Sequence, residues 1–222
     1  MLANRKVSIL GCGWVGQALK FKLKDRYEVT CLSHDIEAND KAAYYDCDVL
    51  VIAIPPRDNY LEVLRQTLEK IATSRQVILL SSISFYDRKP LVIEAEVLLS
   101  KLHERVVILR LGGLMGYERI AGKYTAGKIL EGNSGTNYVH RDDVIGILEN
   151  VIAKRLNTGV YDVVAPKQTS KKDIFIQNAK KFGFEDTLFK DGVLSFKELS
   201  PERICDTLDY SFIKPDVKTF WD

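Results

Sequence analysis

The sequence lacks long hydrophobic runs and a large net charge of either sign, and each shortage excludes a class of protein. No apolar stretch approaches the roughly 20 residues that a membrane-spanning helix needs. The 32 basic and 30 acidic residues leave a net charge of +2, which gives no general attraction to nucleic acid or to an acidic membrane. The first residues lead into a predicted strand without a secretory leader. We therefore expect a cytoplasmic protein that binds neither membrane nor nucleic acid.

Cysteine and histidine are also scarce. The chain has four cysteines, far apart and without C-x-x-C spacing: Cys12, Cys31, Cys47 and Cys205. Three of them fall in or beside predicted strands, a pattern that favours reduced, mostly buried thiols. The three histidines have no metal-ligand spacing with the cysteines or with each other, so no metal site is predicted.

A short apolar strand that runs into a glycine-rich turn stands at the beginning of the chain. Residues 7–10 form the strand, and Gly11, Gly13 and Gly16 fit the dinucleotide fingerprint G-x-G-x-x-G. The first glycine allows the tight turn, the second lets the backbone approach a pyrophosphate, and the third lets helix pack on strand. The N–H groups around Trp14 and Val15 would face the phosphates at the positive end of the helix dipole. This loop predicts a dinucleotide site.

Strands and helices alternate through the first half of the chain. Apolar runs and helical periodicity predict strands at 7–10, 28–32, 48–54, 76–80 and 106–109, and helices at 14–24, from 59, and at 91–102. Such alternation gives a doubly wound parallel α/β sheet, the NAD(P)-binding Rossmann fold. We treat the 222 residues as one Rossmann-like unit, with a dinucleotide-binding core over 1–110.

The second half, 111–222, is expected to complete this core and to add a small α+β lobe on the substrate side. Residues 111–137 hold seven glycines and predict loops near a cleft. A helix over 144–153, a strand over 159–164 and a helix from Ser170 to Phe182 follow, and the last forty residues suggest short strands or turns. Three helix starts have predicted caps: Asn59, Asp142 or Asp143, and Ser170.

The end of the second strand should meet the adenosine ribose, where an acid favours NAD and an arginine favours NADP. The sequence offers Ser33 and His34 in the turn, and Asp35 falls past the strand end. Neither cofactor is preferred.

Five segments, in this order, resemble the extended short-chain dehydrogenase/reductase superfamily, the NAD-dependent epimerase/dehydratase group, and more closely its shortened bacterial members. They cover about residues 1–165 and are found at 11–16, 54–56, 81–86, 109–116 and 137–144. The resemblance implies NAD or NADP as cofactor, with contacts from the glycine loop, Ser33, His34, Ile54 and Pro55. It also implies a small-molecule substrate, and a homodimer is the candidate assembly.

The family's chemistry uses a Ser or Thr and a Y-x-x-x-K helix, in which Tyr exchanges a proton and Lys lowers its pKa. The resemblance places Ser82 at the Ser/Thr position. With Glu96 as the family's helix glutamate, Arg88 stands at the Tyr position and Val92 at the Lys position, so the dyad is missing. Tyr86 is the nearest substitute for the acid.

Two other patterns imitate catalytic motifs. Tyr124 and Lys128 have Y-x-x-x-K spacing, but they follow the strand that ends near Arg110, where the family has substrate-side loops. The same segment almost spells a phosphate-binding loop, but Ile129 replaces the Ser/Thr that would bind Mg²⁺, and no buried strand precedes it. Neither pattern supports a function.

The residues leave several roles open. The segment that begins with His140 and Arg141 is better explained by helix capping and loop support than by catalysis. Arg110 either anchors a substrate anion or pairs with an acid inside the fold.

The leading hypothesis is an oxidoreductase or epimerase that acts on a small carbonyl, hydroxyl or sugar-like compound. Ser82 would orient the substrate oxygen, and Tyr86 or a water would supply the proton. The alternative is a catalytically silent dinucleotide-binding or redox-sensing protein.

Overall fold

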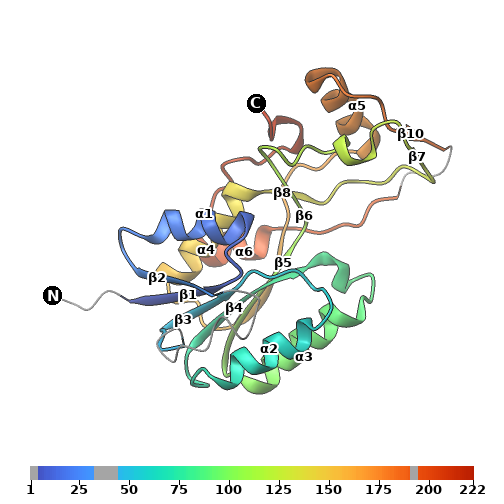
Figure 1. Ribbon diagram of the computed structural model, residues 1–222. Coiled ribbons are helices and arrows are strands. Elements are labelled where there is room, and N and C mark those ends of the chain that lie inside the picture. Colours follow the sequence, from blue (N-terminus) through green and yellow to red (C-terminus); the bar gives the residue numbers. More distant parts are fainter. Residues whose placement is uncertain (1–4, 33–44, 191–194) are drawn as a thin grey trace. The chain divides into compact units, whose positions relative to one another are not determined.

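The computed structural model describes residues 5–32, 45–190 and 195–222 (Figure 1). Within these ranges, no helix is both long and apolar enough to cross a bilayer. The chain divides into two compact units: unit 1 holds residues 1–110 and 145–161, and unit 2 holds 111–144 and 162–222. Each unit is therefore made of two separate segments, and the boundaries between them fall within β5, α4 and β9.

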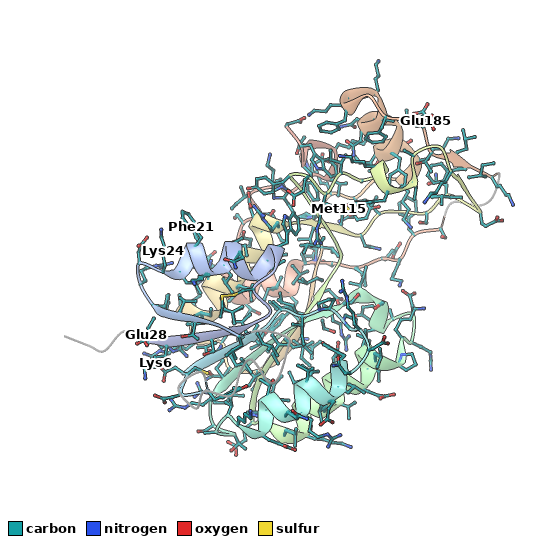
Figure 2. The ribbon with its side chains drawn as sticks, viewed as in Figure 1. Lys6, Phe21, Lys24, Glu28, Met115 and Glu185 are labelled. Carbon is teal, nitrogen blue, oxygen red and sulfur yellow. A yellow bond between two sulfur atoms is a disulfide. The ribbon has the colours of Figure 1, made fainter. Side chains whose placement is uncertain are left out.

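Unit 1 is built on a six-stranded sheet with the order β2-β1-β3-β4-β5-β9. The strands are β1 (Lys6–Leu10), β2 (Glu28–Leu32), β3 (Val49–Ile52), β4 (Gln76–Ser82), β5 (Arg105–Leu111) and β9 (Gly159–Val163). β1 pairs in parallel with β2 and with β3, and β3 pairs in parallel with β4. The amino-terminal edge is marked by the register partners Lys6 and Glu28, both labelled in Figure 2. The glycine loop therefore lies at the opposite, carboxyl edge.

Helices cover both faces of this sheet, as Figure 1 shows. α1 (Trp14–Leu23) lies on the same face as α4 (Arg141–Ala153), while α2 (Tyr60–Glu69) and α3 (Pro90–Leu102) pack together on the other face. On the outward side of α1, Phe21 and the C-cap residue Lys24 point away from the sheet (Figure 2). The Lys24 ammonium lies 4.2 Å from the centre of the Phe21 ring. This arrangement is the doubly wound α/β fold that the sequence predicts.

Burial explains why the strands are read so directly from the sequence. The four residues of β3 are all fully buried, as a central parallel strand covered on both faces requires. Under α2 and α3, one core cluster joins the strands to the apolar sides of the two helices; it includes Leu10, Leu50, Leu64, Leu79 and Leu99. This core holds the carboxyl ends of β1, β3 and β4 in fixed register.

Unit 2 contains short elements around a smaller aromatic core. Its strands pair in parallel two by two, β6 (Gly113–Met115) with β8 (Tyr138–His140) and β7 (Ile129–Leu130) with β10 (Leu188–Phe189). Its helices are α5 (Lys171–Phe182), α6 (Glu202–Leu208), and the 3-10 turns η4 (Lys123–Thr125) and η5 (Val217–Thr219). The core is formed by residues such as Tyr138, Ile174, Phe175, Val217 and Phe220.

The three predicted helix starts differ in how far the structure agrees with them. The Ser170 side chain accepts a hydrogen bond from the Asp173 N–H at 3.0 Å, as predicted for the start of α5. At α2, Asn59 stands at the predicted N-cap position, but it has a left-handed φ of 59° and its side chain makes no capping bond. At α4 the prediction was wrong, because the helix begins at Arg141 and both Asp142 and Asp143 lie in its first turn.

The last forty residues also differ from the expected short strands and turns, since they include α6. Ile204 and Leu208 are its fully buried residues, four apart and hence on one face. Seven residues are too few for a clear helical period.

Candidate functional site

A cavity of about 500 Å³ lies in unit 1 at the carboxyl edge of the sheet. Its walls are the glycine loop at 11–13, the end of β2 at 31–32, and residues between 53 and 63 after β3. In the sheet, β2 lies on one side of β1 and the next strand along the chain, β3, lies on the other side. The strand order therefore reverses direction at β1. In doubly wound sheets, this reversal opens a crevice in which ligands bind.

The three glycines differ in what surrounds them. Gly11 has a φ of +95°, and a Cβ there would lie 2.6 Å from the Ile54 side chain. A Cβ at Gly16 would collide with the carbonyl oxygen of Gly11. At Gly13, by contrast, a Cβ would have no heavy atom within 4 Å. The loop is therefore tightly packed at Gly11 and Gly16 and open at Gly13, which fits the close approach of a dinucleotide phosphate.

The predicted cofactor residues divide into three groups. Gly11, Gly13, Ile54 and Pro55 line the cavity. Trp14, Val15 and Gly16 form the first turn of α1, directly after it. Ser33 and His34 lie outside the described residues.

Sequence reasoning missed the part of the cavity wall that follows the Pro55-Pro56 pair. Arg57 is exposed there, and Tyr60 is buried at the start of α2. An exposed cation just after a buried strand is a signal for an anion contact, and it could have been noticed. Burial raises the pKa of the Tyr60 hydroxyl, which therefore stays protonated.

The cysteine prediction was wrong for two of the four thiols. Cys12 and Cys31 form a disulfide, with their Cα atoms 5.8 Å apart. The parallel register of β1 and β2 sets Ile9 beside Cys31, and the Gly11 N–H donates to the Leu32 carbonyl at 3.0 Å. This long-range pairing brings together two cysteines separated by 19 positions. Cys47, which is buried, and Cys205 are free thiols.

A second group of polar side chains follows β4, the strand two places along from β1. Ser82 ends β4 and caps the 3-10 turn η3 (Ile83–Phe85). Its Oγ accepts from the Ser84 N–H at 3.1 Å and from the Ser84 hydroxyl at 2.9 Å. Since the Ser82 oxygen is the acceptor in both bonds, its own hydrogen can be donated to a ligand. Tyr86 follows η3 and is 42% exposed.

Arg110, at the end of β5, is paired with an acid inside the fold. Its guanidinium donates to Glu96 Oε2 at 2.7 Å and to Oε1 at 3.1 Å, and Glu96 also accepts from the Ser81 hydroxyl at 2.6 Å. The same guanidinium donates to the Tyr86 hydroxyl at 3.2 Å. Burial opposes the charge of Arg110, but the bonds to Glu96 and Tyr86 outweigh it and raise the pKa of the guanidinium. The cation is fixed beside the phenol oxygen of Tyr86.

The positions that would carry the family's Tyr and Lys have other roles. Arg88 has a φ of +55° and precedes α3, so it does not lie on that helix. Val92 is 5% exposed and belongs to the core side of α3. The imitation dyad in unit 2 begins at Tyr124, which is 70% exposed within η4.

The segment at the start of α4 lies in unit 2. His140 is buried, and its Nδ1 accepts from the Asp142 N–H at 3.2 Å. The Tyr117 hydroxyl donates to the Asp142 carboxylate at 2.8 Å, and the Arg141 guanidinium lies 4.0 Å from the Tyr117 ring centre. Burial lowers the pKa of His140 despite the charges of Asp142 and Asp143.

Asp143 is fully buried and binds a distant stretch of unit 2. Its carboxylate accepts from the Ile213 N–H at 2.6 Å, from the Lys214 N–H at 3.1 Å and from the Tyr210 hydroxyl at 3.0 Å. Burial raises its pKa, although these bonds act in the opposite direction. Asp143 holds the chain after α6 in place.

Comparison with known proteins extends the likeness over nearly the whole chain. No family model matches. The sequence is 28% identical to Protein YeeZ of Escherichia coli over 266 aligned positions, which cover 96% of this chain and 97% of the relative. Because the alignment is longer than the 222 residues of this chain, YeeZ has insertions relative to it.

Three solved structures share the fold. The chain has a TM-score of 0.79 and 23% identity to a provisionally assigned NAD-dependent epimerase/dehydratase from Methylobacillus flagellatus, covering 98% and 96% of the two chains. It has a TM-score of 0.73 and 17% identity to the UDP-glucuronic acid 4-epimerase of Bacillus cereus in complex with NAD, covering 97% and 95%. For human epimerase family protein SDR39U1 with NADPH, the values are 0.71 and 18%, covering 97% of each. The predicted Rossmann-like fold is confirmed.

Proposed function

We propose that this chain binds NAD or NADP in the cavity of unit 1 and transfers hydride to or from a small carbonyl, hydroxyl or sugar-like compound. The observation that carries the proposal is the cavity itself, which lies at the carboxyl ends of β2, β1 and β3 and is walled by the glycine loop. Structural neighbours in complex with NAD or NADPH support it, and they include an epimerase of a nucleotide sugar.

The glycine loop would bind the pyrophosphate. Gly13 leaves open space on the cavity side, and the first turn of α1 directs its N–H groups and its dipole toward the same place. Arg57 offers a cation at the cavity wall, next to the carboxylate of Asp58. Ile54 and Pro55 offer an apolar surface after β3. These residues position a dinucleotide, which when bound would supply the hydride acceptor or donor.

The residues after β4 would handle the substrate oxygen and its proton. Ser82 can donate its hydroxyl hydrogen to that oxygen. Tyr86 would exchange the proton, with Arg110 beside its phenol oxygen at 3.2 Å. A positive charge at this distance stabilises the negative charge that develops on the phenol oxygen as the proton leaves. The lysine of the family's dyad lowers the pKa of its tyrosine in the same way.

One observation favours the second candidate, a dinucleotide-binding protein without turnover. The position of the family's lysine is occupied by Val92, whose side chain is buried in the core and offers no charge. Under this reading, Arg110 and Tyr86 serve only to fix η3 against β5.

Cofactor binding is tested by titrating the protein with NADH and NADPH and following nicotinamide fluorescence. Saturable binding is expected, and Gly13→Val should weaken it sharply because a branched side chain would fill the open space. Gly132→Val is the matched control, since a Cβ at Gly132 also meets no atom within 4 Å but lies in unit 2. No binding of either nucleotide up to millimolar concentration would contradict both candidates.

Turnover is tested with a panel of aldehydes, ketones and nucleotide sugars. If the chain is an enzyme, Ser82→Ala and Tyr86→Phe should each reduce kcat by roughly 10²–10⁴-fold, as the loss of acid–base groups does. Tyr124→Phe, at the exposed tyrosine of the imitation dyad, should leave the rate unchanged. Binding without turnover of any compound would favour the second candidate.

A further inference from the structure

The Cys12–Cys31 disulfide joins two walls of the proposed dinucleotide cavity. Cys12 lies between Gly11 and Gly13 in the loop, and Cys31 is the last residue but one of β2. Both line the cavity. Both residues are partly exposed. The bond therefore forms on the cavity surface itself.

We propose that Cys12 and Cys31 are a reversible redox site, and that their oxidation weakens dinucleotide binding. The inference rests on the proposed function, because it names a control of the same cavity. The oxidant class is a low-molecular-weight disulfide, and the reductant is a thiol.

The chemistry balances as two successive exchanges. The thiolate of one cysteine attacks a sulfur of the small disulfide, which forms a mixed disulfide and releases one thiol. The second cysteine thiolate then attacks the protein sulfur of that mixed disulfide and releases the other thiol. Two protein thiols are oxidised by two electrons, one small disulfide is reduced to two thiols, and the two cysteine protons end on the released thiols.

The backbone holds the two thiols ready for this reaction. The register of β1 and β2, and the hydrogen bond from the Gly11 N–H to the Leu32 carbonyl, hold the loop against the end of β2. Both contacts are independent of the sulfur atoms. A Cα separation of 5.8 Å is within the usual range for a disulfide, so reduction and oxidation need no large movement of the backbone.

The same position explains the effect on binding. In dinucleotide folds, the loop after the first strand receives the pyrophosphate, and a residue about 20 positions later contacts the adenosine ribose. Cys12 belongs to the first of these segments, and Cys31 precedes the predicted ribose contact Ser33 by two positions. A covalent bridge between them occupies the space over which the ribose must connect to the phosphates.

The two remaining cysteines are poorly suited to the exchange. Cys47 is 2% exposed, and burial raises the pKa of its thiol. Burial also raises the pKa of the Cys205 thiol. A smaller thiolate fraction slows the attack on a disulfide at both cysteines, and burial also blocks access to Cys47; Cys205 is partly exposed. Oxidation should thus be confined to Cys12 and Cys31.

The test compares the full chain reduced by a phosphine with the full chain oxidised by glutathione disulfide. Alkylation and mass spectrometry should show a bond between Cys12 and Cys31, with Cys47 and Cys205 still alkylated. Titration with NADPH and NADH should then give a Kd at least about tenfold higher for the oxidised protein, and added thiol should restore the lower value. Cys12→Ser/Cys31→Ser should give the same Kd before and after treatment with glutathione disulfide, while Cys47→Ser should retain the full response.

The outcomes separate this inference from the proposed function. Equal Kd values for the fully oxidised and the reduced protein, or tighter binding by the oxidised protein, would overturn the inference and leave dinucleotide binding intact. Failure of glutathione disulfide to form the bond would also overturn it alone. Absence of binding to both forms would overturn the proposed function and the inference together.

Discussion

Gly13 and Gly16 belong to the same loop, yet only one of them is confined by the fold. A Cβ at Gly16 meets the Gly11 carbonyl oxygen, and it also comes within 3.3 Å of the Ile9 side chain. Backbone cannot yield to such a contact as the end of a flexible side chain can. The packing of α1 on β1 therefore depends on Gly16, whereas Gly13 is available for a ligand.

We expect Gly16→Ala to lower the free energy of unfolding by about 1–3 kcal/mol, the usual cost of overpacking. Gly13→Ala, the matched substitution three residues earlier, should change it by less than about 0.5 kcal/mol, since the added methyl meets no atom. Urea denaturation followed by circular dichroism measures both. Equal losses would show that the loop packs differently.

His140 predicts a dependence of stability on pH. Burial lowers its pKa below the unfolded value of 6.5, so the unfolded chain takes up more protons below that pH than the folded chain. The stability that neutral His140 contributes is present above pH 6.5 and is lost as the pH falls through the folded pKa. Asp143, whose pKa burial raises, acts in the opposite direction, so a variant is needed to isolate the histidine.

The free energy of unfolding should fall between about pH 7 and pH 5, and the fall should be smaller in His140→Asn. Asparagine keeps an acceptor for the Asp142 N–H but does not titrate. Urea denaturation at four or five pH values gives the two slopes. Identical slopes in the two proteins would remove His140 as a source of the dependence.

At the scale of elements, Glu96 connects α3 to two strands. Its carboxylate, on a side chain 5% exposed, accepts from Ser81 on β4 and from Arg110 on β5. Removal of the acid would leave Arg110 mostly buried without its counter-charge, which costs far more than the loss of an exposed ion pair.

Glu96→Ala should lower the free energy of unfolding by about 3–5 kcal/mol. Glu94→Ala, two residues away on the exposed side of the same helix, should change it by less than about 0.5 kcal/mol. Guanidinium denaturation of the two variants measures the difference. A loss below 1 kcal/mol for Glu96→Ala would mean that water replaces the carboxylate at Arg110.

The elements themselves could largely be predicted from the sequence, because hydrophobic periodicity reports burial. β2 has the predicted bounds, and α1 and α3 differ from theirs by a single residue at one end. The lack of a side-chain capping bond at Asn59 and the bond between Asp143 and Ile213 could not be predicted, since they depend on a backbone dihedral angle and on a partner 70 residues away. A local pattern contains neither.

The candidate site divides in the same way. The glycine loop could be predicted because turn, phosphate approach and helix packing are all encoded within six residues. Arg57 had a local signal that went unused, a cation just after a buried strand. The Cys12–Cys31 disulfide had none, since it follows from the alignment of β1 and β2 side by side. The roles of Ser82 and Tyr86 stay predictions.

At the scale of the whole molecule, the notable feature is that the sheet of unit 1 is completed by a late segment. β9 pairs beside β5, and residues 145–161 belong to unit 1. Two hydrogen bonds attach this segment to early strands: the Arg5 guanidinium donates to the Ile152 carbonyl at 2.7 Å, and the Gln76 amide donates to the Leu156 carbonyl at 2.6 Å.

A fragment of residues 1–110 should therefore fail to fold stably, although it includes the proposed dinucleotide loop. It would expose the edge of β5 and the apolar surface that α4 covers, both of which promote association between chains. Size-exclusion chromatography and urea denaturation, with the full chain as control, test this. A monomeric fragment with a cooperative transition would show that residues 145–161 are dispensable.

The late position of β9 also has a consequence while the chain is being made. After β5 has been synthesised, about 50 further residues must be added before β9 exists, which takes roughly 3–10 s at the usual 5–20 residues per second. During that interval the nascent sheet has an open edge at β5, a template for pairing with another chain. For this protein, the pace of translation sets how long that edge stays exposed, and a chaperone that covers it would act between these two strands.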